Sequence, residues 1–149
     1  SQFSFNERKL AFIEATKRLN LTVKDYWVKE TGNYLYSDGY AAMKEMVEET
    51  KGDLPEVMFA VSDMYALGII AALEDSGYSV PKDVSVVGFD DIEFVKYCKP
   101  SLSTVKQDTK LIGETAAKLL LDMIEKDYYD ENPKIHRIKT RYIKRDSTI

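Results

Sequence analysis

The chain has 149 residues, and its 21 Lys and Arg against 25 Asp and Glu give a formal net charge of −4. With 44% hydrophobic and 31% charged residues, its composition is typical of a soluble globular domain and excludes a disordered, collagen-like or disulfide-rich chain. The negative net charge argues against nucleic-acid binding by this segment, because binding to phosphates needs a basic patch. No apolar run approaches the roughly 20 residues that a membrane helix needs.

Cysteine and histidine are each present once, as Cys98 and His136. A lone cysteine excludes an internal disulfide and a thiolate metal cage, and it fits a reducing compartment. The two residues do not form a metal-ligand spacing, and the common nucleotide, zinc-protease and hydrolase signatures are missing from the sequence. We therefore expect no cofactor and no metal. The first residues carry charge where a signal peptide would be apolar, which predicts a cytoplasmic protein.

The first third of the chain predicts two helices separated by an extended stretch. Ser4 and Glu7 have capping-box spacing, and the apolar residues after them recur at helical intervals, so a helix is expected over 6–19. A strand over 24–29 follows, and then a loop over 31–37 that ends in an N-cap at Ser37. A second helix ends at Lys51 and Gly52.

Short apolar runs then alternate with helical periods. The runs 57–61 and 84–89 predict strands buried on both faces, and Ser62 and Asp63 are placed to cap a helix that reaches residue 76. A short helical turn over 92–97, an extended stretch over 104–106, a long helix capped by Asp108 or Thr109, a loop over 127–133 and an edge strand over 134–144 complete the pattern. The fold class is therefore predicted to be α/β, a parallel sheet flanked by helices.

Two polar pairs follow the buried strands. Ser62 and Asp63 come after the first, and Asp90 and Asp91 come after the second. In an open α/β sheet the carboxyl ends of neighbouring strands border the ligand crevice, so both pairs are candidates for ligand contact. Their other interpretation is capping of the following helices. Adjacent residues that leave a strand point in different directions, which disfavours a pair of carboxylates sharing a proton.

Arg8 and a group of aromatic residues are further candidates. Arg8 falls in the first turn of the predicted helix, which the helix dipole disfavours for a cation, so it faces either solvent or a specific anionic or hydroxyl-bearing partner. Trp27, Tyr34, Tyr36 and Tyr40 crowd one stretch of chain. They fit either a core or interface, or a ligand platform.

Long stretches of the sequence resemble one known family. The runs FAVSDMYALG at 59–68 and GYSVPKDVSVVGFDD at 77–91 are followed by PSLSTVKQ at 100–107 and by RDST at 145–148. Together they resemble the ligand-sensing domain of the LacI/GalR family of bacterial transcription regulators. The resemblance covers nearly the whole chain in the correct order.

The resemblance implies a two-lobed, periplasmic-binding-protein-like (type I) fold that binds a small effector, usually a sugar, between the lobes. Residues 1–103 and 134–149 would belong mainly to the second lobe, and the helix within 104–126 would belong to the first lobe. The DNA-binding headpiece and most of the first lobe would lie outside this segment. The family also implies a homodimer whose contact face maps to 35–40, 66–71 and 94–99.

Four ligand-binding residues are implied by position in the family motifs. Arg8 takes the place of an effector-contacting arginine, and Asp90 that of a ligand-binding aspartate. Tyr34 takes the position of an aromatic residue that stacks on the ligand. Ser62 stands where many members have an asparagine that hydrogen-bonds the effector, and this departure bears on which sugar is bound. Asp63 and Asp91 are expected to remain caps.

The predicted function is the effector-sensing and dimerisation part of a transcriptional repressor, without enzymatic activity. Its partners would be a small effector, a second copy, and operator DNA through the headpiece alone, with no membrane. A periplasmic solute-binding protein is the nearest alternative, and an α/β enzyme using Asp90 and Asp91 is a more remote one.

Overall fold

The computed structural model describes residues 2–125 and 135–149. In chain order its elements are helix α1 (Gln2–Arg18), 3-10 turn η1 (Asp25–Trp27), helix α2 (Tyr36–Thr50), strand β1 (Val57–Phe59), helix α3 (Asp63–Asp75), strand β2 (Ser85–Asp90), 3-10 turn η2 (Glu93–Lys96), strand β3 (Ser103–Lys106), helix α4 (Thr109–Glu125) and strand β4 (Arg141–Ile143).

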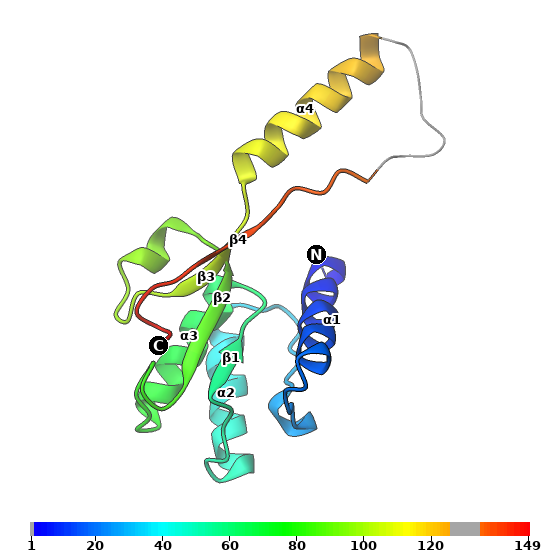
Figure 1. Cartoon of the computed structure of the whole chain (residues 1–149). Coiled ribbons are helices and arrows are strands. Elements are labelled where there is room, and N and C mark those ends of the chain that lie inside the picture. Colours follow the sequence, from blue (N-terminus) through cyan, green and yellow to red (C-terminus); the bar gives the residue numbers. More distant parts are fainter. Residues whose placement is uncertain (1, 126–134) are drawn as a thin grey trace.

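One sheet with the strand order β1-β2-β3-β4 organises the body (Figure 1). The pairs β1/β2 and β2/β3 are parallel, with Met58 opposite Val86 and Gly88 opposite Thr104. The last strand is antiparallel to β3 and places Tyr142 opposite Val105. The α/β class with a mostly parallel sheet is thus confirmed, because each parallel return requires a crossover connection.

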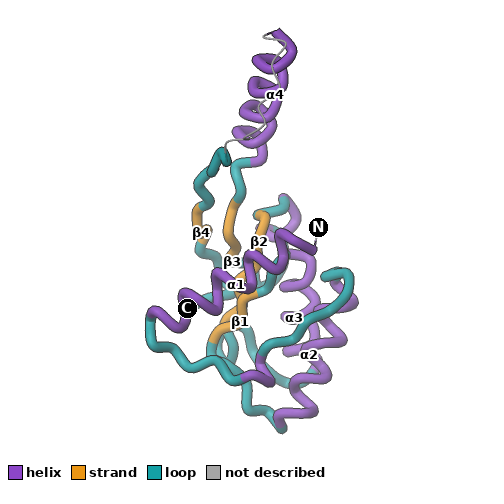
Figure 2. Tube along the Cα trace, turned by 90° about the vertical axis from the view of Figure 1, so that its right-hand side faces the viewer, coloured by secondary structure: helices purple, strands orange, loops and turns teal. Residues whose placement is uncertain are grey.

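Helices cover the two faces of the sheet unequally. On one face, α2 and α3 lie side by side (Figure 2) and enclose the core. On the other face α1 lies alone, with the Phe12 ring stacked 5.2 Å from that of Phe59. Successive strand residues point to opposite faces, so Phe59 faces α1 whereas Met58 and Ala60 pack with the α2 and α3 core.

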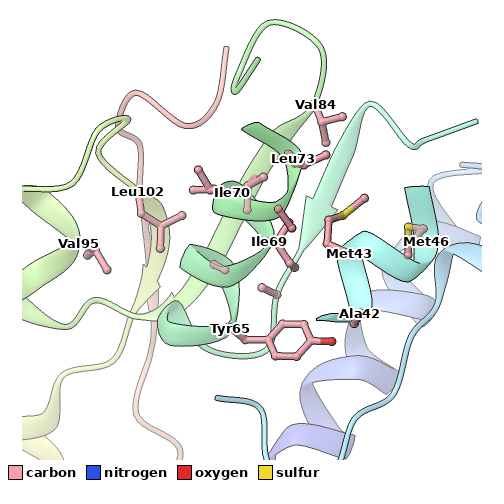
Figure 3. Packing of buried hydrophobic residues seen from close by; sticks show 14 residues of the cluster. Ala42, Met43, Met46, Tyr65, Ile69, Ile70, Leu73, Val84, Val95 and Leu102 are labelled. Carbon is pink, nitrogen blue, oxygen red and sulfur yellow. The ribbon is translucent and has the colours of Figure 1, made fainter. Parts of the chain in front are cut away.

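The core depends on direct contact between the backbones of α2 and α3. Its fully buried side chains include Met43, Leu73 and Val84 (Figure 3). A Cβ built on Gly68 would lie 2.0 Å from the Tyr36 carbonyl oxygen, and one on Gly39 would lie 2.2 Å from the Tyr65 carbonyl oxygen. No side chain fits at either point, so the two glycines set the distance between the helices.

Helix α4 projects away from this body (Figures 1 and 2). Of the two caps that the sequence offers, Asp108 and Thr109, the structure uses Asp108, which accepts a hydrogen bond from the Leu111 backbone N–H at 3.0 Å. None of its residues is buried. Its large exposed apolar side chains are Leu111, Ile112, Leu120, Leu121, Met123 and Ile124.

Four local predictions are wrong. Ser4 and Glu7 lie inside α1 rather than at its cap, and Arg8 is accordingly beyond the first turn. Helix α2 begins before Ser37, at Tyr36, where Asp38 accepts from the Leu35 backbone N–H. The segment 24–29 contains the turn η1 instead of a strand, because no strand in the described part of the chain lies beside it to pair with.

At the far end, only Arg141–Ile143 of the expected edge strand pairs with β3. The expected loop over 127–133 lies outside the described residues. In the ranges 2–125 and 135–149, no helix is long and apolar enough to cross a bilayer.

Candidate functional site

Polar and aromatic side chains gather where β1, β2 and β3 end, on the face covered by α1. Because these strands are parallel, their carboxyl ends meet along one edge of the sheet. A hollow of about 480 Å³ lies at this edge. It is lined by Glu7, Arg8, Ala11, Phe12, Phe59, Phe89 and Val105.

Arg8 ties α1 to the ends of two strands. Its Nη1 donates to the Val61 carbonyl oxygen at 2.6 Å. Its Nη2 lies 3.3 Å from Asp90 Oδ1, and its guanidinium carbon lies 3.8 Å from the centre of the Phe89 ring. With 15% of its side chain exposed, the cation is held by a carboxylate, a carbonyl and an aromatic face at once.

Asp90 closes β2 in an unusual backbone conformation. Its φ is 117°, and Asp91 follows with φ 57°. Positive φ values are costly for residues other than glycine and are retained where the surroundings hold them. Gln107 Nε2 donates to Asp90 Oδ1 at 2.7 Å. Both protein partners therefore use Oδ1, and among the described residues none donates to Oδ2.

Tyr34 joins the site through the aromatic ring of Phe5. The Phe5 and Tyr34 ring centres are 4.6 Å apart, and the Arg8 guanidinium carbon lies 5.5 Å from the Phe5 ring centre. Tyr34 also contacts Tyr65, with ring centres 5.7 Å apart, and it adopts φ 57°. The structure thus connects Arg8, Asp90 and Tyr34 into one surface, with Phe5 between the charged and aromatic parts.

Ser62 contributes to this surface through the backbone of Tyr34. Its Oγ accepts from the Tyr65 backbone N–H at 3.3 Å, which caps α3 as predicted, and donates to the Tyr34 carbonyl oxygen at 3.2 Å. Only 9% of Ser62 is exposed. The hydroxyl is therefore engaged in holding the backbone of Tyr34, and its contact with a ligand stays a prediction.

Asp63 is not the simple cap that the sequence suggests. It is 1% exposed, and its carboxylate accepts from the Ile92 backbone N–H at 2.9 Å and from Thr104 Oγ1 at 2.5 Å. Burial raises the pKa of this carboxyl, and the hydrogen bonds from Thr104 and Ile92 partly oppose that rise. Asp63 thereby joins the start of α3 to β3 and to the turn after β2.

Asp91 is not a cap either. It pairs with Arg145 Nη2 at 2.6 Å and with Lys106 Nζ at 3.0 Å, while its side chain is 10% exposed. Burial alone would raise its pKa, but the hydrogen bonds from Arg145 and Lys106 outweigh burial and lower the pKa. The residue anchors the C-terminal segment, and its carboxylate is taken up by protein cations.

Sequence reasoning missed Phe5, Phe89 and Gln107 as members of the site. Phe5 stands three residues before Arg8, a helical spacing that places the two on one face. Gln107 follows β3 just as Asp90 ends β2, and this shared position at the ends of adjacent strands was the available signal. In the described ranges 2–125 and 135–149, no group of three His, Cys, Asp or Glu residues is arranged to hold a metal ion.

Comparison with known proteins matches almost the entire chain. The model of the periplasmic binding protein-like domain family matches residues 2–148. The HTH-type transcriptional repressor PurR of Yersinia enterocolitica is 32% identical over 140 residues, which are 94% of this chain and 40% of the relative. The chain thus spans about 40% of the length of the curated relatives it matches.

Solved structures agree with this assignment. A complex of the transcriptional regulator CelR with cellobiose superposes with a TM-score of 0.84 and 32% identity, over 95% of this chain and 42% of that one. A Lac repressor dimer bound to operator and the anti-inducer ONPF gives a TM-score of 0.86 at 28% identity, over 98% of this chain and 48% of that one. The resemblance to LacI/GalR regulators is therefore confirmed, and the chain belongs to the periplasmic binding protein-like domain family.

Proposed function

We propose that the chain is the effector-sensing part of a sugar-responsive transcriptional repressor, and that Arg8, Tyr34 and Asp90 contact the sugar. The observation that carries the proposal is the Asp90 carboxylate: Arg8 and Gln107 hold its Oδ1, and no residue of the described part of the chain donates to its Oδ2. Sugar hydroxyls donate to carboxylates and accept from guanidinium groups, and the carbon face of a sugar packs on aromatic rings. Ser62 would act on the ligand by positioning Tyr34.

The proposed mechanism is a shift between lobe arrangements. An effector held between this lobe and the other would favour the closed arrangement and so alter operator affinity in the whole protein. Operator binding would come from a headpiece outside these residues, since this segment is acidic. The chain would do this work as part of a cytoplasmic repressor, and the matched relatives are HTH-type transcriptional repressors.

Dimerisation is the second part of the proposal. Within the three segments expected to form the contact face, Leu35, Tyr36, Phe94 and Tyr97 are exposed, at 42% to 68%. Ala66, Ile69 and Ile70 are buried in the body of the same chain, so they would act by shaping that surface. An isologous interface between two copies would bury the exposed aromatic side chains.

Titration with sugars followed by NMR amide shifts tests the effector site on the chain itself. Cellobiose and ribose are suitable probes, because each is bound in a solved structure of a similar regulator. Amide shifts also report the weak binding that we expect of one lobe alone. We expect shifts around Arg8, Tyr34, Asp90 and Gln107, and their loss in Asp90→Asn. Asp25→Asn, an exposed aspartate in η1, is the matched control. Shifts that persist in Asp90→Asn, or that map elsewhere, contradict the site.

A further inference from the structure

The end of β2 holds two consecutive residues in backbone conformations that side chains rarely adopt. Asp90 has φ 117° and Asp91 has φ 57°. Positive φ is costly for residues other than glycine, and it persists where surrounding contacts fix the backbone. We refer to residues 90–92 as the effector turn, because Asp90 carries the proposed sugar contact. The direction of the Asp90 carboxylate therefore depends on the contacts that fix this turn.

The effector turn is held both through a side chain and through its backbone. Arg8 and Gln107 bond to Asp90 Oδ1. These bonds act on a side chain, whose position follows from the backbone that carries it. The backbone of the turn is bonded by Asp63 of α3, whose Oδ2 accepts from the Ile92 N–H at 2.9 Å. Asp63 thus restrains the last residue of the turn.

The Asp63 carboxylate is itself fixed by the surrounding structure. Asp63 is the first residue of α3 and is 1% exposed. Its Oδ1 accepts from Thr104 Oγ1 at 2.5 Å, and Thr104 is fully buried in β3. Each carboxylate oxygen therefore has a donor, one from β3 and one from the effector turn. A buried carboxylate that is bonded at both oxygens has little rotational freedom, so it can fix the groups that donate to it.

A glycine in the sheet leaves space for the Asp63 carboxylate. Gly88 lies opposite Thr104 in the ladder between β2 and β3, just before the effector turn. A Cβ built on Gly88 would overlap Asp63 Oδ1, so a larger residue at this position would displace the carboxylate. The next residue, Phe89, contacts α1 with its ring, and neighbouring strand residues face opposite sides of a sheet. Asp63 and α1 therefore hold the end of β2 from opposite faces.

We propose that Asp63 is a positioning residue of the effector site, a role that rests on the sugar contact proposed for Asp90. By fixing Ile92, Asp63 holds the effector turn so that Asp90 meets Arg8 through Oδ1 and offers Oδ2 to a sugar hydroxyl. Asp63 itself does not contact the sugar. It acts as a hydrogen-bond acceptor, so asparagine can replace it, with the amide oxygen accepting from Ile92 and the amide nitrogen donating to the Thr104 hydroxyl. Alanine offers no acceptor.

NMR couplings measured on the whole chain test this positioning. In the wild type, a coupling across the hydrogen bond between the Ile92 amide nitrogen and the Asp63 carboxyl carbon should be observed. The coupling between the amide and α protons of Asp90, and the same coupling in Asp91, report the two φ angles. In Asp63→Ala we expect both φ-dependent couplings to change, because the turn loses its backbone restraint. In Asp63→Asn we expect the wild-type values.

Leu73→Ala is the matched control, because Leu73 is fully buried at the other end of α3 (Figure 3). This variant should lose stability, as large-to-small core substitutions do, but keep the wild-type couplings in the effector turn. Thr104→Val removes the donor to Asp63 Oδ1 and serves where Asp63→Ala does not fold. It should weaken the coupling across the Ile92 hydrogen bond. Unchanged φ-dependent couplings in Asp63→Ala, equal changes in Leu73→Ala, or no wild-type coupling across the hydrogen bond overturn the proposal.

Sugar titration followed by amide shifts separates the positioning role from the proposed function. Asp63→Ala should weaken the binding of cellobiose or ribose by about tenfold, the factor that corresponds to one lost hydrogen-bonded contact. Asp63→Asn and Leu73→Ala should bind with close to wild-type affinity. Changed φ-dependent couplings in Asp63→Ala with unchanged sugar affinity overturn the positioning role. If the wild type binds neither sugar, the proposed function fails on these probes, and the couplings still decide whether Asp63 holds the effector turn.

Discussion

The guanidinium of Arg8 rests 3.8 Å above the ring of Phe89, linking the second turn of α1 to the last residues of β2. The same side chain reaches Val61 and Asp90. These polar contacts of Arg8 and the stack of Phe12 on Phe59 together attach α1 to the sheet.

Arg8→Ala should therefore loosen α1. We expect a loss of about 1–3 kcal/mol in the free energy of unfolding, because a partly buried cation–π contact and a charge-assisted hydrogen bond disappear. Amide exchange in Gln2–Arg18 should accelerate more than exchange in α3. Arg18→Ala, at the exposed end of the same helix, is the control and should change stability by less than about 0.5 kcal/mol. Equal effects of the two substitutions would contradict this assignment.

The backbone at Asp90 allows its strain to be separated from its charge. Asp90→Ala removes the carboxylate but keeps a side chain at φ 117°. Asp90→Gly removes the carboxylate and relaxes the backbone, so it should be about 1 kcal/mol more stable than Asp90→Ala. Urea unfolding of the two variants measures the difference. Both should lose sugar-induced amide shifts, and an alanine variant as stable as the glycine variant would show that no strain is stored.

Asp91 should make the fold acid-sensitive. Its pKa is lowered in the folded state by Arg145 and Lys106 against the opposing effect of burial. The unfolded chain therefore takes up the proton first, near its ordinary pKa of about 3.9. The stabilisation is present above that pH and is lost as pH falls through the lowered folded pKa. In Asp91→Asn, the free energy of unfolding measured with urea should depend less on pH in this acid range. An unchanged pH dependence would refute the role of the ion pairs of Asp91 with Arg145 and Lys106.

Asp63 should act in the opposite direction. Burial raises its pKa in the folded state, so its contribution is greatest below about pH 3.9 and declines as pH rises through the folded value. At neutral pH, Asp63→Ala should still cost about 2–4 kcal/mol, because the Thr104 hydroxyl and the Ile92 amide lose their acceptor. Chemical denaturation at pH 7 measures this cost, with the exposed Asp25→Ala as control. A cost below about 0.5 kcal/mol, which is typical of an ordinary surface substitution, would contradict this role of Asp63.

The close approach of α2 and α3 predicts a contrast between two glycines. Gly68→Ala places a Cβ 2.0 Å from the Tyr36 carbonyl oxygen and should destabilise the protein by more than about 2 kcal/mol. Gly113→Ala in α4 meets nothing within 4 Å and should raise helix content, since alanine is favoured over glycine by about 1 kcal/mol. Thermal unfolding followed by circular dichroism compares them. A tolerated Gly68→Ala would mean that the helices separate at little cost.

Periodicity and capping chemistry gave reliable local predictions where the deciding interactions are short in range. The helices containing Met43 and Leu73, a buried strand over 84–89 and a helix cap at Asp108 or Thr109 were all predicted. Each depends on residues a few positions apart, and the structure has the strand at Ser85–Asp90 and the cap at Asp108. The prediction of a strand over 24–29 was wrong because strand formation depends on residues far away in the sequence. A strand needs a partner, and the β-type residues around Trp27 have no ladder neighbour among the residues that the structure describes.

The sequence by itself determined the α/β class, the family resemblance and the identity of Arg8, Tyr34, Ser62 and Asp90 as candidates. It did not determine that Phe5 bridges Arg8 and Tyr34, that Gln107 shares Asp90 Oδ1, or that Asp63 is buried against Thr104. Those contacts join residues from separate elements across the sheet. Only tertiary packing decides such distances and the solvent exposure that sets each pKa, because neither is encoded in local periodicity.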